Sequence, residues 1–229
     1  PGQGQTSRAQ KGQIDDFNTY HENILEWIKI ANEYKIPTFV LGVGLGGLII
    51  LNLLEKTELP IEGILLFSPM LELKRDYKGR KNKLISNVGK ISKDTRFKVG
   101  ITPQDLTRND EIIEETANDG LMLKKVTYSW YNLINEKMKE TMDHIRDIKP
   151  ISALIMYGTK DKILETQSIN EMKDKLKSKE MYFKVWDGLY HEIHNEPERD
   201  LVMRYVLSFL NNSVNTMGFI VNEEEIEDI

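Results

Sequence analysis

The 229-residue chain is 40% hydrophobic, which is enough to bury one sizeable core and predicts a single domain with room for an insertion. Its 31 basic and 36 acidic residues alternate along the sequence and leave a net charge of -5, so the basic surface of a nucleic-acid-binding protein is excluded. The absence of cysteine excludes disulfides, thiolate metal sites and cysteine nucleophiles, and it is consistent with a cytoplasmic location.

Helices and short apolar strands alternate along most of the chain. In chain order, we expect a helix at residues 16–31, a strand at 38–41, a helix at 48–56, a strand at 64–67, a helix at 127–145, a strand at 153–157, a helix at 165–176, a strand at 181–186 and a helix at 197–210. This α/β pattern is typical of a parallel sheet covered by helices on both faces. The longest apolar run, residues 45–54, is too short to span a membrane, so no transmembrane segment is expected.

A long segment between the second and third strands interrupts this alternation. It is rich in lysine, has scattered apolar positions and predicts no strand. It is either a solvated loop region or a lid over a pocket, and we favour the lid because long excursions in compact domains are usually functional. The expected organisation is a first part of the core, a cap, a second part of the core and an acidic tail: residues 1–70, 71–125, 126–212 and 213–229.

The first predicted strand is too apolar for an open sheet edge. Residues 39–41 read Phe-Val-Leu, and such an edge would promote aggregation. We therefore expect another strand to cover it, either from sequence that precedes Pro1 or from a partner chain. The chain begins without methionine and without the apolar stretch of a signal peptide, so we expect that it begins inside a longer protein or follows a processed segment.

The glycine-rich turn GVGLGG, residues 42–47, follows this strand and has two interpretations. It matches G-x-G-x-x-G, the fingerprint of a dinucleotide site in which a helix N-terminus binds a pyrophosphate. Two features disfavour this interpretation. No acidic residue ends the next strand, where Phe67-Ser68-Pro69 stand, and a long helix precedes the motif.

The same turn also has the position of a nucleophile elbow, G-x-S-x-G, in which a strained strand-to-helix turn presents a serine hydroxyl. Gly42, Gly46 and Gly47 would allow the strand and the helix to approach closely, and the backbone N–H of Leu45 would be an oxyanion donor. Gly44 occupies the nucleophile position and has no side chain. The turn alone is equally compatible with a purely structural role.

An acid and a histidine follow the last two predicted strands. Asp161 is the fourth residue after the strand at 153–157, and His191 is the fifth after the strand at 181–186. Nucleophile, acid, base is the chain order of one class of serine hydrolase, in which the histidine accepts the proton of the nucleophile and the carboxylate orients the imidazole. Either residue alone has a simpler explanation, Asp161 as a helix cap and His191 as a structural histidine. Their places at successive strand ends predict a triad remnant.

The other histidines do not predict a metal site. His194 and His191 form H-x-x-H with Glu192 between them, which is the wrong spacing for a helical zinc motif, and no third ligand is evident. We expect His194 at the surface or behind the site residues. His21 and His144 lie on amphipathic helices, and no chemistry is expected of them.

Several segments, in the order of the chain, resemble the monoacylglycerol lipases and lysophospholipases, which are α/β-hydrolases grouped with the serine aminopeptidase-like enzymes. The similarity covers residues 1–212 and is carried by PGQGQTSRAQKGQIDDFNTYHENILEWI, TFVLGVGLGGLI, FSPML, LTRNDEIIEETANDGLMLKKVTYSW, LIMYGTKDKI and GLYHEIHNEPERD. The elbow of that family is usually G-H-S-M-G-G or G-H-S-L-G-G. Val43-Gly44 stand here in place of His-Ser, which favours natural loss of the nucleophile over an engineered substitution.

The resemblance implies an α/β-hydrolase fold, an eight-stranded and mostly parallel sheet flanked by helices with an inserted helical cap. It implies that the first strands, with an early His-Gly oxyanion segment, precede the present sequence. It also implies cleavage of esters with one acyl chain, such as monoacylglycerols or lysophospholipids, without a metal or organic cofactor. Asp161 and His191 would be the acid and the base, and Leu45 would supply one oxyanion donor.

These observations leave three hypotheses for the function. The first is a carboxylic-ester hydrolase fold that is catalytically impaired at Gly44 and acts as a lipid-binding or regulatory pseudoenzyme. The second is slow hydrolysis in which His191, oriented by Asp161, activates a water beside Gly44. The third, less favoured, is dinucleotide binding at the glycine turn. The expected partner is a small lipid or ester ligand and no nucleic acid, and transient contact with a membrane surface is compatible with this.

Overall fold

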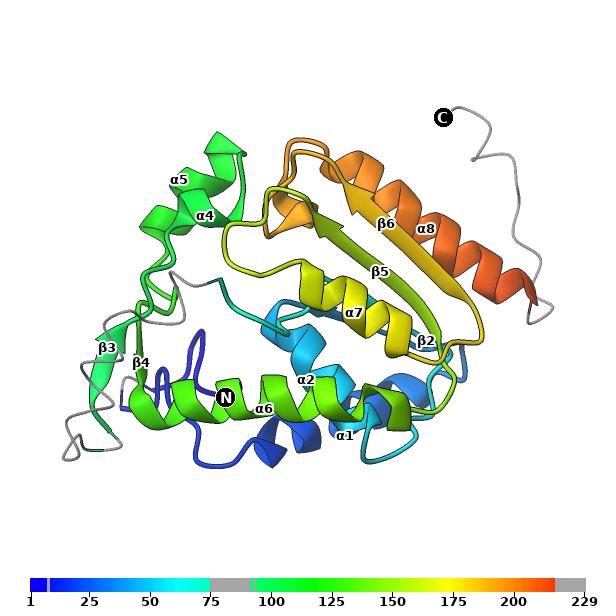
Figure 1. Cartoon of the computed structure of the whole chain (residues 1–229), viewed down its shortest axis with the longest axis horizontal. Helices are drawn as coiled ribbons and strands as arrows, with labels where there is room; N and C mark the ends of the chain where they lie inside the picture. The colour runs from blue at the N-terminus through cyan, green and yellow to red at the C-terminus, as the bar shows by residue number, and fades with distance from the viewer. Residues whose placement is uncertain (8, 75–91, 93, 217–229) are drawn as a thin grey trace.

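The computed structural model describes residues 1–7, 9–74, 92 and 94–216 and centres on a four-stranded parallel sheet (Figure 1). The strands are β1 (Phe39–Val43), β2 (Gly63–Phe67), β5 (Ser152–Gly158) and β6 (Met181–Trp186), and they lie side by side in that order. All four strands expected from the sequence are confirmed, each within two residues of its predicted ends.

Each face of the sheet is covered by helices, as the apolar strands predict. The helices are α1 (Asn18–Asn32), α2 (Leu45–Leu54), α6 (Tyr128–His144), α7 (Gln167–Lys175) and α8 (Arg199–Thr216). Leu66 and Ile155 belong to the hydrophobic core formed with α2, α6 and α7, whereas Phe67 and Met156 face the core formed with α8. Successive strand residues point to opposite faces, so each strand needs an unbroken apolar run to fill both cores.

The excursion between β2 and α6 contains more regular structure than the sequence predicts. It includes two helices, α4 (Pro103–Leu106) and α5 (Asp110–Asn118), and two strands, β3 (Arg96–Lys98) and β4 (Lys125–Thr127), which pair antiparallel. The prediction of no strand in this segment is therefore wrong, because three-residue strands are too short to display an alternating pattern. Residues 75–91 and 93 of the predicted cap lie outside the described residues, as do residues 217–229 of the predicted tail.

The helices α4 and α5 lie near the carboxyl ends of β5 and β6 (Figure 1). A backbone hydrogen bond from Glu192 N to the carbonyl oxygen of Leu106, 2.8 Å long, joins α4 to the loop that follows β6. Loops after parallel strands meet at this end of a sheet, which is where ligands bind in open α/β folds. The excursion thus has the place that a cap requires.

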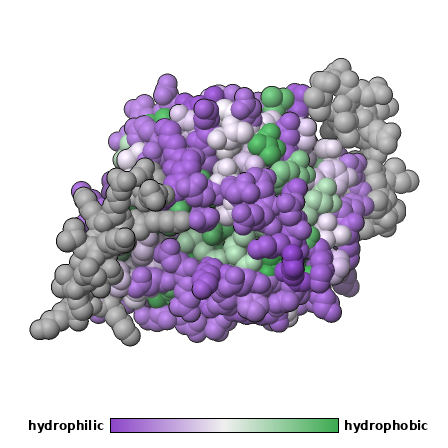
Figure 2. Space-filling view, viewed as in Figure 1, coloured by the Kyte–Doolittle hydropathy of each residue, from purple (hydrophilic) through white to green (hydrophobic). Residues whose placement is uncertain are grey.

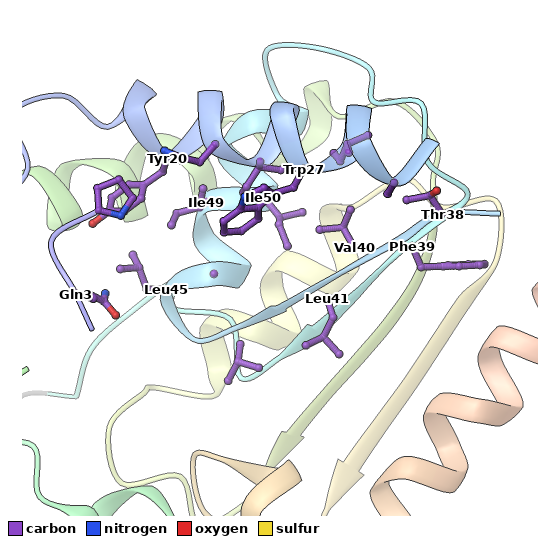
Figure 3. A pocket seen from close by; sticks show the side chains of 17 residues that line it. Gln3, Tyr20, Trp27, Thr38, Phe39, Val40, Leu41, Leu45, Ile49 and Ile50 are labelled. Atoms are coloured by element: carbon purple, nitrogen blue, oxygen red, sulfur yellow. The ribbon is translucent and has the colours of Figure 1, made fainter. Parts of the chain in front are cut away.

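Strand β1 forms one edge of the sheet within the described part of the chain. Leu41 at this edge is 49% exposed, and a groove of about 520 Å³ runs beside the strand. Figure 3 shows Tyr20 and Trp27 of α1 and Ile49 of α2 at this groove. That a further strand covers this apolar edge stays a prediction.

Hydrophilic residues cover most of the face seen in Figure 2, and apolar residues are visible in a recess near its centre. None of the helices in the described ranges has both the length and the apolar character needed to cross a membrane.

A polar cluster is enclosed where α2 packs against α6. Asn52 Nδ2 lies 3.2 Å from Glu55 Oε2 and 3.1 Å from Thr141 Oγ1. Burial, together with the neighbouring Glu140, raises the pKa of the Glu55 carboxyl to about 7 against the opposing effects of Thr141, His144 and Lys56. Glu55 therefore keeps its proton in the folded protein at pH values at which the unfolded chain has lost it.

We expect Glu55→Gln to weaken the pH dependence of stability. Because the folded pKa lies above the ordinary value of 4.5, stability is lost as pH rises from that value through about 7, and a glutamine removes this loss. The measurement is urea unfolding at about pH 5 and about pH 8, where the parent should lose more stability than the variant. Glu58→Gln, at an exposed position, is the control and should behave as the parent. Equal pH dependence in parent and Glu55→Gln would contradict the prediction.

A candidate active site at the carboxyl ends of the strands

The structure brings Asp161, His191 and Gly44 together. Gly44 directly follows β1, Asp161 lies in the loop after β5, and His191 lies in the loop after β6. His191 Nδ1 is 2.8 Å from Asp161 Oδ2. Parallel strands place their carboxyl ends at one edge of the sheet, so residues 30 positions apart in the sequence come into direct contact.

Asp161 is fully buried and has partners for both carboxylate oxygens. Oδ1 accepts hydrogen bonds from the backbone N–H groups of Ile163, at 2.8 Å, and Leu164, at 2.9 Å. Burial alone would raise the pKa of this carboxyl, but the hydrogen bond and charge of His191 and the two backbone donors outweigh it, so the pKa is lowered. The carboxylate therefore both caps a turn and orients the imidazole. The expected helix cap is not observed, because α7 begins at Gln167 and the two backbone donors belong to the preceding loop.

Gly44 has a backbone conformation that side chains rarely adopt. Its φ is +51° and its ψ is -115°, and α2 begins at the next residue. The carbonyl oxygen of Gly44 accepts from Gly47 N, at 3.0 Å, and from Met70 N, at 2.9 Å, while its N–H donates to Phe67 O at 3.0 Å. This tight turn from strand to helix is tied to the end of β2 and has the geometry of a nucleophile elbow.

His191 points its second ring nitrogen at this turn. A Cβ atom added to Gly44 would lie 3.2 Å from His191 Nε2 and 3.7 Å from Cε1. The histidine is 6% exposed, so the imidazole is held between the buried carboxylate and the bare backbone of the elbow. The arrangement provides an oriented base and a place for a reacting atom, but residue 44 supplies no hydroxyl.

Two of the three elbow glycines are required by close packing, and one is not. A Cβ at Gly42 would lie 2.6 Å from Gly47 N, and one at Gly47 would lie 2.8 Å from Pro69 Cβ. At Gly46, however, an added Cβ meets no described atom within 4 Å. The expected steric reason for a glycine therefore does not apply to Gly46 within the described residues.

Leu45 is the first residue of α2 and also lines the groove beside β1 (Figure 3). The first N–H groups of a helix have no carbonyl partner within the helix, so they can donate to an anionic group. Leu45 directly follows Gly44, and its role as an oxyanion donor stays a prediction.

The remaining histidines lie apart from this contact. His194 is half-buried, with its ring centroid 6.1 Å from that of Phe67, and burial lowers its pKa. Of the two positions expected for His194, the structure favours the one behind the site residues, because the loop turns its ring inward. His21 packs against Phe17, and His144 pairs with Asp147 at the surface. No cluster of three or more potential metal ligands occurs in the described ranges.

Sequence reasoning missed a second set of residues that supports His191. Glu196 is fully buried, and its Oε1 accepts from the backbone N–H of Tyr190 at 2.8 Å. Its Oε2 is 2.8 Å from Nε of Arg108, on the segment between α4 and α5. Gly158, the last residue of β5, packs so closely on the histidine loop that an added Cβ would lie 2.6 Å from the carbonyl oxygen of Tyr190. The only sequence signal was that Glu196 and Gly158 lie near the predicted site residues.

Comparison with known proteins gives consistent matches over nearly the whole chain. Residues 1–198 match the family described as serine aminopeptidase, S33. Phospholipase YtpA of Bacillus subtilis is 30% identical over 215 residues, which cover 93% of this chain and 83% of that protein. The crystal structure of a monoacylglycerol lipase from Paleococcus ferrophilus has a TM-score of 0.74 at 23% identity, covering 93% of this chain and 81% of the other. A soluble variant of the Saccharomyces cerevisiae monoglyceride lipase, in complex with a substrate analog, has a TM-score of 0.81 at 19% identity, covering 93% and 75%.

Proposed function

The chain belongs to the serine aminopeptidase S33 family of α/β-hydrolases, and on this basis we propose that it binds single-chain acyl esters at the site around His191 without forming an acyl-enzyme. One observation carries the proposal. The oriented dyad of Asp161 and His191 faces Gly44, which has no atom that could attack an ester carbonyl. The protein would thus be an ester-hydrolase-type binding protein that is catalytically impaired.

The missing nucleophile decides against ordinary serine hydrolysis. In a triad enzyme, removal of the nucleophile costs on the order of a million-fold in kcat, and the residual rate comes from the oxyanion hole and from binding. Binding itself does not depend on the hydroxyl. A site can therefore retain its ligand and lose its turnover.

The ligand class is supported by the names of the relatives and by the position of the excursion. One relative carries the name phospholipase, and the two structural neighbours are monoacylglycerol or monoglyceride lipases, one of them with a substrate analog bound. Helices α4 and α5 of the excursion lie near the same end of the sheet as the dyad, and the excursion would act as the cap that shields an acyl chain from water. Monoacylglycerols and lysophospholipids combine one such chain with a small polar head.

A second function is favoured by the intact dyad. His191 Nε2 faces the backbone of Gly44, and a water admitted beside this contact would be within reach of a base oriented by Asp161. The reaction would be a slow, direct hydrolysis of the ester by water, without a covalent intermediate. Dinucleotide binding has less support, because the N–H of Gly44 at the centre of the turn donates to Phe67 O rather than to a ligand.

One experiment tests both proposals. The full-length protein is incubated with a fluorophosphonate probe and, separately, with p-nitrophenyl esters, while a non-hydrolysable ether analogue of a monoacylglycerol is titrated by calorimetry. We expect saturable binding of the ether, no fluorophosphonate labelling and no burst of p-nitrophenol. Slow ester turnover that is lost in His191→Ala would establish the water-mediated route. Labelling of any residue by the fluorophosphonate would refute both.

A further inference from the structure

The backbone of His191 is held on both sides by groups connected to the excursion between β2 and α6. The preceding residue, Tyr190, donates its N–H to Glu196 Oε1 at 2.8 Å, and the following residue, Glu192, donates its N–H to Leu106 O at 2.8 Å. Leu106 is the last residue of α4. The position of the imidazole therefore depends on Leu106, which lies outside the loop that carries it, and on Glu196, which lies further along the same loop.

Arg108 connects these contacts into one unit. Its Nε is 2.8 Å from Glu196 Oε2, and its backbone N–H donates to the same oxygen at 3.3 Å. A second guanidinium nitrogen, Nη2, is 2.5 Å from Glu198. Glu196 is fully buried, so its charge requires this partner, and burial of an unpaired carboxylate would be costly.

Thr107 strengthens the same connection. It is 1% exposed, and its Oγ1 donates to the carbonyl oxygen of Asn195 at 2.9 Å while accepting from Asn109 N at 3.1 Å. Residues 106–108 thus contact the loop that carries His191 at Glu192, Asn195 and Glu196. A group of buried hydrogen bonds of this kind has few alternative arrangements.

We infer that Arg108 and Glu196 are positioning residues for His191, through which the cap holds the imidazole against Asp161 and over Gly44. Movement of the segment around Arg108, as on entry of a ligand beneath the cap, would be transmitted to the imidazole through the Glu196–Tyr190 hydrogen bond. The inference rests on the proposed role of His191 as the base of the site. Its test, however, requires no turnover.

The test measures the rate at which diethyl pyrocarbonate modifies each histidine, followed by peptide mass spectrometry of the full-length protein. Glu196→Gln keeps the shape of the side chain but places an amide where Tyr190 N–H or Arg108 needs an acceptor. We expect the modification rate of His191 to rise about tenfold, the factor that corresponds to loss of one hydrogen bond to a charged group. Exposed His144 should react at the parent rate.

Two further variants separate positioning from general stability. Glu198→Gln removes the other ion pair of Arg108 and leaves the Glu196–Tyr190 hydrogen bond, so the rate at His191 should stay near that of the parent. Arg108→Lys keeps the positive charge but not the paired geometry, and an intermediate rate is expected. It also provides the test if Glu196→Gln fails to fold.

Buried His21, on the distant helix α1, distinguishes local from global opening. A selective rise at His191 supports the inference. If the modification rates of His21 and His191 rise together in a variant that folds, the ion pair of Arg108 and Glu196 only stabilises the protein, and the inference is overturned. An unchanged rate at His191 would overturn it as well. The loss of activity proposed at Gly44 affects none of these outcomes.

Discussion

Gly44→Ser is expected to create serine esterase activity in this protein. The elbow already has the backbone conformation in which a nucleophile is presented, and the Cβ position is 3.2 Å from His191 Nε2, so the new hydroxyl would be within hydrogen-bond reach of the base. Because nucleophile removal costs about a million-fold in kcat, even partial recovery should raise kcat/KM for p-nitrophenyl esters by about a thousand-fold or more. The same variant should become sensitive to fluorophosphonates.

The cost to stability is also predictable. A residue other than glycine at a φ of +51° is strained by about 1–3 kcal/mol, and the ring of His191 must shift by a few tenths of an ångström to admit the Cβ. Gly44→Ala introduces the same strain without the hydroxyl and is therefore the matched control. It should lose stability to the same extent and show no gain in ester hydrolysis. A folded Gly44→Ser protein that neither turns over esters nor reacts with the probe would show that the site lacks more than its nucleophile.

Gly158→Ala is expected to be among the most destabilising single substitutions in the chain. The added methyl group would overlap the carbonyl group of Leu189 and lie 2.6 Å from the carbonyl oxygen of Tyr190, and backbone atoms cannot move aside as a flexible side chain can. Overpacking at such a contact costs about 3 kcal/mol. Since Leu189 and Tyr190 directly precede His191, relief of the overlap should also displace the imidazole from Asp161.

Urea unfolding of the parent and the variant measures the first effect, and a crystal structure of the variant measures the second. Gly120→Ala is the matched control, because the same methyl group at Gly120 meets no described atom within 4 Å. It should leave the midpoint of unfolding almost unchanged. A stability of Gly158→Ala equal to that of the control would mean that the histidine loop is not packed against β5 as described.

The strands and helices of this protein follow from short-range patterns. Burial on both faces of the sheet demands continuous apolar runs, and these are visible in the chain at β2 and β5 before any contact is known; the edge strand β6 includes Lys184 and is only partly buried. The order of Gly44, Asp161 and His191 is equally local, since each residue follows the end of a strand. Parallel pairing then requires the three to share one end of the sheet, whatever the details of packing.

Other features depend on groups that are distant in sequence and give no local signal. Arg108 and Glu196 are 88 residues apart, and neither has neighbours that mark it as one of an ion pair. Glycine is required at position 158 because the backbone of another segment lies against it, and no such contact requires glycine at position 46 in the described chain. The burial of His194 follows from the course of its loop. The strands β3 and β4 are too short to carry a period of their own and are stabilised only by each other and by the segments they contact. The spacing of apolar residues in the sequence shows which side chains face the hydrophobic core. The features above depend instead on one particular partner residue, which only the folded chain brings near.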